Sequence, residues 1–268
     1  AVGLFIWLWP IGRRSTVAAV CCWSFPIFTA LAQGQDDSFL LAVIGIAVCL
    51  MRAGRPFAAG LVFALCASKF QLFLLVPFWI VAQRLWQFGR GFVTGAGCLV
   101  AVSFLAGGLR WPLRFLALLT DPVTNPSGDV MPNLYGIFAQ MPHGLTLEIA
   151  SAVGISAVAL WSFRRMSFEY GLAMTTAAGI LIGHHAYVND CAILIPGLLI
   201  LYWQAKTAGE RLFAVVMFTP FVYIGSLAGP VLVTVTRLTL VSFVGLLAWI
   251  AGRSARPPAA PAPSSPGV

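Results

Sequence analysis

Long, unbroken apolar runs recur along this 268-residue chain and constrain its fold more than any other feature. Only 9% of the residues are charged, against about 25% in an ordinary soluble domain. A water-soluble fold could not bury this much apolar surface, so lipid is the expected solvent. Membrane barrels need alternating apolar and polar residues, whereas continuous runs favour helices. We therefore expect an all-α polytopic membrane protein, and not a soluble domain, a disordered chain or a nucleic-acid-binding protein.

About ten membrane segments are predicted, and together they form an integral membrane domain over residues 1–251. The segments are 1–9, 15–32, 38–51, 57–83, 91–109, 143–163, 170–183, 191–205, 212–229 and 231–251. The first is a partial helix with no charged residues before it, which is typical of a truncated chain and not of a signal peptide. Residues 252–268 are rich in proline, alanine and serine and should form a disordered cytoplasmic tail.

Six pairs of basic residues separate the apolar runs and predict the topology. The pairs are Arg13/Arg14, Arg52/Arg55, Arg84/Arg90, Arg164/Arg165, Lys206/Arg211 and Arg253/Arg256. If all of them lie on the cytoplasmic side, segment 57–83 must be a re-entrant or split helix pair that turns near Lys69. Such half-helices usually line a cavity. The polar loops 33–37, 110–142 and 184–190 then share the outer face with this turn, and we expect the chemistry there.

Lys69 is the only charged residue within segment 57–83. Because an ammonium group is costly inside a membrane, Lys69 should face a cavity or a partner. A phosphate is a natural ligand for it, with Gln71 as a further contact. The alternative is that Lys69 lies at an interfacial turn and reaches the headgroups.

Gln35, Asp36 and Asp37 form a polar loop between two apolar segments and are candidate substrate-binding residues. An aspartate or Ser38 could instead cap the helix that follows. A cap accounts for one aspartate and not for both.

The densest polar cluster is the loop His-His-Ala-Tyr-Val-Asn-Asp at 184–190. Imidazole titrates near neutral pH, so His185 and Asp190 are candidate catalytic residues and His184 is a candidate substrate ligand. The alternative is a solvated loop in which Asp190 caps the next helix. No metal site is predicted, because adjacent histidines rarely point the same way. The six cysteines form no CxxC motif and indicate neither a zinc site nor a disulfide framework.

Loop 110–142 begins with an expected amphipathic helix that lies on the membrane surface. Arg110 could bind a lipid phosphate there, or it could anchor the helix at the interface together with Arg114. Asn133 and Tyr135 open a second short helix and are further candidate substrate-binding residues. The chain contains no Walker A loop, HExxH motif or dinucleotide fingerprint.

The order of these motifs resembles glycosyltransferase family 87. Residues 59–81, AGLVFALCASKFQLFLLVPFWIV, are similar to a family segment in which a lysine follows small apolar residues. Three shorter elements are similar to family elements as well: Gly34-Gln35, Asn133-Leu134 and HHAYVNDCAILIP at 184–196. Family members usually carry a proline soon after the lysine, where this chain has Phe70-Gln71. The resemblance implies a C-type glycosyltransferase fold.

The resemblance also implies the activity. It is that of a membrane hexosyltransferase that takes a sugar, often mannose, from a polyprenyl-phosphate carrier. The acceptor is a glycan or glycolipid on the outer, periplasmic face of the cytoplasmic membrane, and neither metal nor nucleotide cofactor is required. The family's catalytic aspartate lies in a first outer loop, which would precede Ala1, so Asp190 or Asp36 is the alternative base. The groups implied to stabilise the leaving phosphate are Lys69, Arg110 and His185.

Two other functions remain open at this point. A polytopic transporter or flippase would need ionisable residues along a pathway, and only Lys69, Glu148 and Arg237 are placed for that. A scaffold or lipid-binding protein without catalytic activity is the other alternative.

Overall fold

The computed structural model describes residues 1–120, 128–225 and 230–254, and every regular element in these ranges is a helix. The elements of the N-terminal half are α1 (Val2–Leu8), α2 (Arg14–Trp23), α3 (Phe25–Ala32), α4 (Asp37–Arg52), α5 (Pro56–Phe63), η1 (Ala64–Leu72), α6 (Val76–Ala82), α7 (Trp86–Gly107) and α8 (Trp111–Thr120). Those of the C-terminal half are η2 (Gly128–Val130), α9 (Leu134–Phe138), α10 (Gly144–Phe163), α11 (Phe168–Ile182), η3 (Asn189–Leu194), α12 (Ile195–Gln204), α13 (Ala208–Phe218), η4 (Pro220–Val222) and α15 (Pro230–Ser254). The all-α membrane fold expected from the apolar runs agrees with this structure.

Three described helices are long and apolar enough to cross a membrane: α7, α10 and residues 233–254 of α15. Helices α2 and α3, which are bent by 63° at Ser24, make a fourth if they form one span. The ten predicted segments are therefore not confirmed. Apolar composition alone does not show where a run breaks into short helices, as happens in Pro56–Leu72.

The predicted boundary between the membrane domain and the tail needs correction. Helix α15 continues to Ser254, so residues 252–254 are helical and do not belong to a tail. The rest of the predicted tail, 255–268, lies outside the described residues, as do 226–229 at the end of a predicted segment and 121–127 in loop 110–142.

Segment 57–83 is divided as the basic residues on both sides of it predict. Helix α5 is followed by the 3-10 helix η1, and α6 comes after a short break. Lys69 interrupts η1 with a non-helical backbone (φ −112°, ψ 53°). Where a helix stops, some backbone N–H and C=O groups have no hydrogen-bond partner within the helix. In an apolar segment such a break lines a cavity or packs against protein, and Lys69 lies at this break.

Glycines allow the helices around this segment to pack closely. A Cβ atom at Gly60 of α5 would lie 1.9 Å from the Phe88 carbonyl oxygen of α7. A Cβ atom at Gly179 of α11 would lie 1.9 Å from the Leu72 carbonyl oxygen of η1. Small residues of this kind let helix backbones approach in membranes. They hold η1 beside α11, and the loop 184–190 follows directly after α11.

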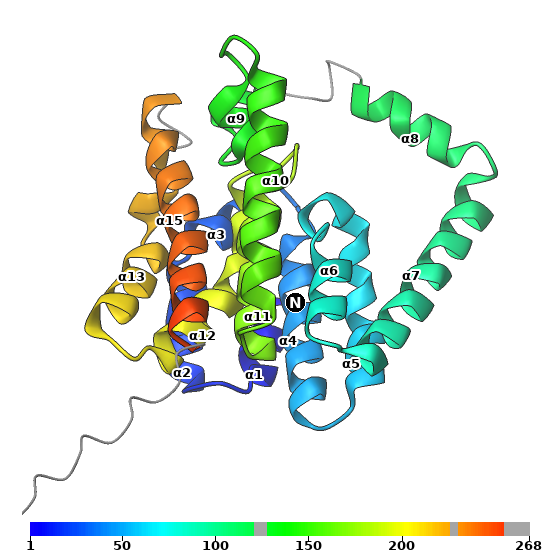
Figure 1. The fold of residues 1–268 in the computed structure, drawn as a ribbon. Coiled ribbons are helices and arrows are strands. Elements are labelled where there is room, and N and C mark those ends of the chain that lie inside the picture. Colours follow the sequence, from blue (N-terminus) through cyan, green and yellow to red (C-terminus); the bar gives the residue numbers. More distant parts are fainter. Residues whose placement is uncertain (121–127, 226–229, 255–268) are drawn as a thin grey trace, which may run out of the picture.

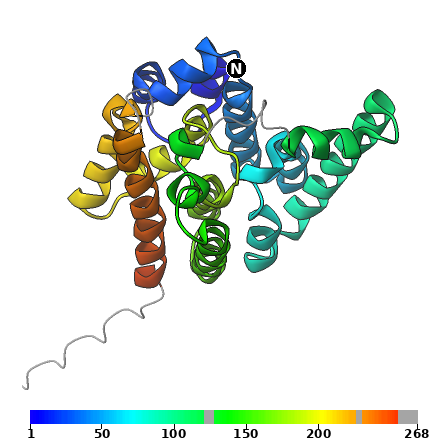
Figure 2. The ribbon, with the colours of Figure 1, turned by 90° about the horizontal axis from the view of Figure 1, so that it is seen from above.

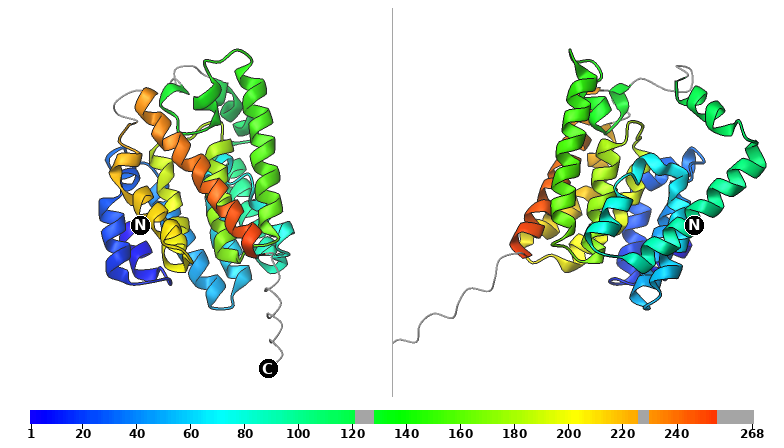
Figure 3. Two further views of the ribbon diagram at one scale, coloured as in Figure 1. Left: turned by 60° about the vertical axis from the view of Figure 1, so that its left-hand side comes forward. Right: turned by 45° about the vertical axis from the view of Figure 1, so that its right-hand side comes forward.

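Helices α7 and α8 extend away from the rest of the bundle (Figures 1 and 3), on the side opposite α13 and α15 (Figure 2). Leu105, near the end of α7, is 87% exposed. Helix α8 is the helix predicted at the start of loop 110–142. It turns back toward the bundle, where the ring centroid of Phe115 lies 6.1 Å from that of Phe70 in η1.

Candidate functional site

The ammonium group of Lys69 lies among three carboxylates. Its Nζ atom is 2.7 Å from Asp37 Oδ1, 2.8 Å from Asp190 Oδ1 and 2.9 Å from Asp36 Oδ1. The ammonium group donates hydrogen bonds to Asp37 and Asp190, and it forms an ion pair with Asp36. We call Lys69, Asp36, Asp37 and Asp190 the lysine cluster. It joins three of the predicted polar regions: the loop 33–37, the Lys69 turn and the loop 184–190.

The members of the lysine cluster differ in their exposure. The side chains of Asp37 and Asp190 are 0% and 5% exposed, whereas that of Asp36 is 48% exposed. Asp36 is therefore the carboxylate of the cluster that a ligand can reach. The buried pair has further partners, because Asn189 Nδ2 donates to Asp37 Oδ2 at 2.8 Å and the Tyr187 N–H donates to Asp190 Oδ2 at 2.7 Å.

Neither loop of the cluster serves as a simple helix cap. Asp36 occupies the N-cap position of α4, but its side chain makes no capping hydrogen bond. Asp37 lies in the first turn of α4, where the helix dipole favours a negative charge. Asp190 caps neither η3 nor α12, because both begin without a side-chain cap. The alternative of a solvated loop with a capping Asp190 is therefore wrong.

The lysine cluster carries more negative than positive charge. Burial raises the pKa of the Asp190 carboxyl above its usual range, and the charge of Asp37 adds to this effect, while the Lys69 ammonium opposes it. One ammonium group shared by three carboxylates holds them together. The same arrangement repels a further anion.

A second group of polar side chains surrounds the start of the loop 184–190. His184 Nδ1 lies 2.8 Å from Glu148 Oε1 of α10. The ring of Tyr135 lies 4.3 Å from that of His184, and the ring of His185 lies 4.8 Å from it, all measured between centroids. We call Glu148, His184, His185 and Tyr135 the histidine cluster. A carboxylate only accepts hydrogen bonds, so Nδ1 of His184 carries the proton and Nε2 is left for a ligand.

The two histidines have different surroundings. The His184 side chain is 51% exposed. Nδ1 of His185 is buried and has no hydrogen-bond partner among the described residues. Burial lowers the pKa of His185, and the neighbouring His184 lowers it further. The neutral form of His185 is therefore favoured.

Asn133 fixes the backbone of the loop. Its side chain is fully buried, and its Nδ2 atom donates to the carbonyl oxygens of Gly183 at 2.7 Å and His184 at 3.0 Å. Its Oδ1 atom accepts from the Gly136 N–H at 2.9 Å and so caps α9. The Arg237 side chain of α15 donates to the Met131 carbonyl oxygen at 3.0 Å, two residues before Asn133.

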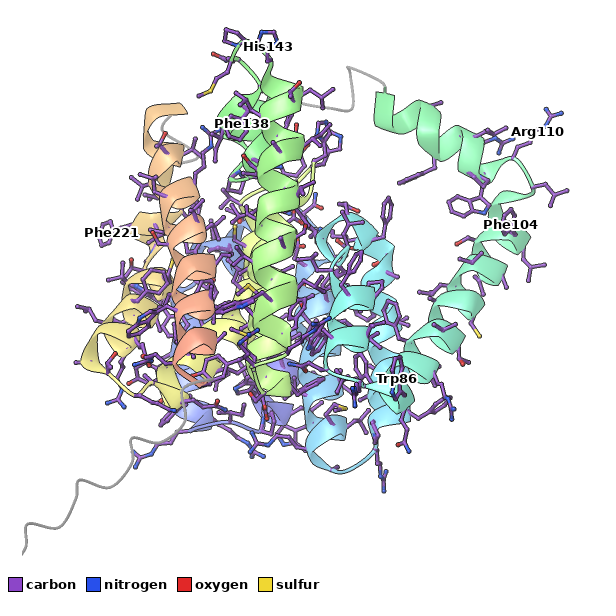
Figure 4. All side chains as sticks on the ribbon, viewed as in Figure 1. Trp86, Phe104, Arg110, Phe138, His143 and Phe221 are labelled. Atoms are coloured by element: carbon purple, nitrogen blue, oxygen red, sulfur yellow. The ribbon has the colours of Figure 1, made fainter. Side chains whose placement is uncertain are left out.

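The structure separates one predicted site residue from the others. Figure 4 shows Arg110 at the corner between α7 and α8, pointing away from the bundle. It belongs to neither cluster. Gln35 is exposed beside Asp36.

Glu148 of the histidine cluster and Asn189, which binds Asp37 of the lysine cluster, were not among the predicted site residues. Asn189 could not be told apart from its neighbours in the polar loop. Glu148 lies in the apolar segment 143–163. A lone carboxylate within such a segment needs a partner, and this could have identified Glu148 as a site residue. Among the described residues, no three His, Cys, Asp or Glu side chains are grouped so that they could hold a metal ion.

Comparison with known proteins identifies one family. The model of glycosyltransferase family 87 matches residues 1–186, which include both histidines and every member of the lysine cluster except Asp190. No curated protein and no solved structure matches the chain.

Proposed function

The chain belongs to glycosyltransferase family 87, and on this premise we propose that it transfers mannose from a polyprenyl-phosphate carrier to a lipid or glycan acceptor. Glycosyl transfer in a membrane follows from the family and from the apolar helices. The hexose, the carrier and the acceptor class are our proposal.

The proposed reaction needs a base and a stabilised leaving group. The acceptor oxygen forms a bond to the anomeric carbon of the sugar, and the bond from that carbon to the phosphate oxygen breaks. The proton of the acceptor hydroxyl passes to a base, and polyprenyl phosphate leaves as an anion. Neither a nucleotide nor a metal ion takes part in these steps.

The assignment of Asp36 as the base depends on the exposure of its side chain. Its carboxylate is half-exposed while it stays 2.9 Å from Lys69 Nζ. Asp190, the catalytic candidate from the sequence, is buried and bound by Lys69 and by the Tyr187 N–H. We therefore assign the base to Asp36 and give Asp190 the role of positioning Lys69. Asp37 has the same positioning role.

Lys69 is then a positioning residue as well. Two of its N–H donors bind Asp37 and Asp190, and its charge pairs with Asp36, so we propose that it makes no direct contact with the phosphate. Its charge holds the Asp36 carboxylate in place. This role replaces the direct phosphate contact that the sequence suggested.

The histidine cluster supplies the contacts to the leaving phosphate in this proposal. Nε2 of His184 is left for a ligand because Glu148 takes Nδ1. His185 adds a neutral imidazole next to it. Tyr135 and Gln35 are proposed to contact sugar hydroxyl groups, and Asn133 holds the loop in place. Arg110 is proposed to contact lipid headgroups at the α7–α8 corner.

The proposed location is the outer face of the cytoplasmic membrane. His143, which precedes α10, and Trp86, at the start of α7, mark opposite ends of the molecule (Figure 4). The Arg84/Arg90 pair flanks Trp86, and the positive-inside rule places such basic loops in the cytoplasm. Both clusters then belong to the other end.

The comparisons and the described residues give no support to a transporter. The ionisable residues on which a transport pathway would depend are bound within the fold. Lys69 binds aspartates, Glu148 binds His184 and Arg237 binds a backbone carbonyl.

A donor assay tests the proposed function. Membranes that contain the protein would be given radiolabelled polyprenyl-phosphate mannose or polyprenyl-phosphate glucose. The label would then be followed into lipid-extractable and polymeric products. We expect transfer from the mannose donor that exceeds transfer from the glucose donor. No transfer from either donor, in membranes where the protein is present and folded, would contradict the proposal.

A further inference from the structure

A groove of about 980 Å³ lies at the end of the molecule opposite the histidine cluster. It is bounded by α6, the start of α7 and the end of α10. Its walls are mainly apolar and include Phe78, Val81 and Leu160. Two guanidinium groups line it, those of Arg84 and Arg164.

A second hollow of about 620 Å³ adjoins the groove. The two share Pro77, Val81 and Trp86, and the second hollow adds Arg90. Among the residues that the structure describes, no acidic residue lines either of them. Together they combine an apolar surface with three cationic side chains, a pattern that suits an amphipathic anion.

The groove is held in shape by a partly buried amide. Gln83 directly follows α6, and its Oε1 atom accepts from Trp79 Nε1 at 2.8 Å. Its Nε2 atom donates to the carbonyl oxygens of Phe163 and Met166, each at 3.0 Å. The next residue, Arg84, has a left-handed backbone (φ 55°), which is uncommon for a residue other than glycine. These contacts join the end of α6 to the end of α10, so Arg84 and Arg164 line one groove.

We propose that this groove binds an anionic phospholipid of the cytoplasmic leaflet. Its phosphate contacts Arg84 and Arg164, and its acyl chains lie against the apolar walls of the two hollows. Basic pockets between membrane helices on the cytoplasmic side bind anionic headgroups. Guanidinium groups match the geometry of phosphate oxygens. The proposal does not depend on the transferase activity.

Thermal unfolding of the full chain in detergent tests this site. The probes are phosphatidylglycerol, phosphatidylcholine and inorganic phosphate. We expect phosphatidylglycerol to raise Tm and the other two to leave it unchanged. Arg84→Gln and Arg164→Gln should each weaken the binding of phosphatidylglycerol. The lipid concentration that gives half of the full rise in Tm should increase by about fivefold in each variant. Both side chains are exposed, so each substitution should leave the fold intact. If one variant does not fold, the other still tests the proposal.

The matched control is Arg165→Gln. Arg165 adjoins Arg164 but lies over the ring of Trp161, with Cζ 4.4 Å from the ring centroid, and does not line the groove. It should keep the full phosphatidylglycerol effect. Equal stabilisation by phosphatidylcholine would overturn the proposal, as would an equal loss in Arg165→Gln. Equal stabilisation by inorganic phosphate would show a site for free anions and would also overturn it.

Discussion

Lys69 Nζ lies 2.8 Å from Asp190 Oδ1, although the two residues are 121 positions apart in the chain. This contact ties the break in segment 57–83 to the loop that follows α11. Since Asp36 and Asp37 bind the same ammonium group, one partly buried lysine holds three of the predicted polar regions together. The stability of the bundle and the placement of the proposed base therefore depend on one side chain.

Replacing Lys69 by methionine should destabilise the protein. Asp37 and Asp190 would be left buried without their cation, and breaking a buried ion pair from one side costs about 3–5 kcal/mol. Thermal or denaturant unfolding in detergent measures this loss. Lys206→Met is the control, because Lys206 is exposed and surface substitutions stay within about 0.5 kcal/mol. Equal stability of the two variants would show that the cluster does not hold the bundle.

Asn133→Ala should loosen the loop 184–190. The variant loses two donors to backbone carbonyls and a helix cap, and each unsatisfied buried group costs about 1–3 kcal/mol. Asn133→Asp keeps the capping oxygen but not the donors, so it should be destabilised as well. Amide hydrogen exchange of residues 184–190 would rise in both variants. Unchanged protection would mean that Asn133 does not hold the loop.

Glu148→Gln should lower kcat/KM for the donor by about tenfold to a hundredfold. A hydrogen bond to a charged group contributes about 1.5–3 kcal/mol, and a neutral amide no longer fixes the proton on His184 Nδ1. Glu169→Gln serves as the control, since Glu169 pairs with the exposed Arg52 at 3.7 Å, away from both clusters. The assignment of His184 fails if both variants retain wild-type kcat/KM.

The stability that His185 contributes to the folded protein should be lost as the pH falls below about 6.5, the ordinary pKa of histidine. Burial lowers the pKa of His185, so between its folded pKa and 6.5 the unfolded chain binds more protons than the folded one. This stability is complete above 6.5 and is lost as the pH falls through the folded pKa. His185→Gln should flatten the slope of Tm between pH 8 and pH 5 more than His143→Gln does. Identical slopes in both variants would contradict the burial of His185.

The meeting of the polar loops could be predicted from the sequence. Arginines on both sides of segment 57–83 exclude a single crossing, and a lysine within an apolar segment needs a partner. Together these two facts bring Lys69 to the same end as Asp37 and Asp190. The structure adds the distances and the difference in exposure that selects Asp36.

Other features depend on packing that a single sequence does not contain. The bond from Asn189 to Asp37 joins residues 152 positions apart. The roles of adjacent residues such as His184 and His185 cannot be distinguished from the sequence alone, and the structure separates them by their exposure and by the contact of Glu148 with His184. The number of spans could not be predicted either, because hydropathy does not show that the apolar run 15–32 bends by 63° between α2 and α3.

Asp36→Asn tests the central claim most directly. Mannose transfer from the polyprenyl-phosphate donor would be measured alongside Tm, for wild type and for this variant. The substitution keeps the size of a half-exposed side chain, so we expect Tm to stay close to that of wild type. Because a general base contributes about 10²–10⁴-fold, kcat should fall by that factor. Wild-type kcat in a folded Asp36→Asn protein would contradict the account.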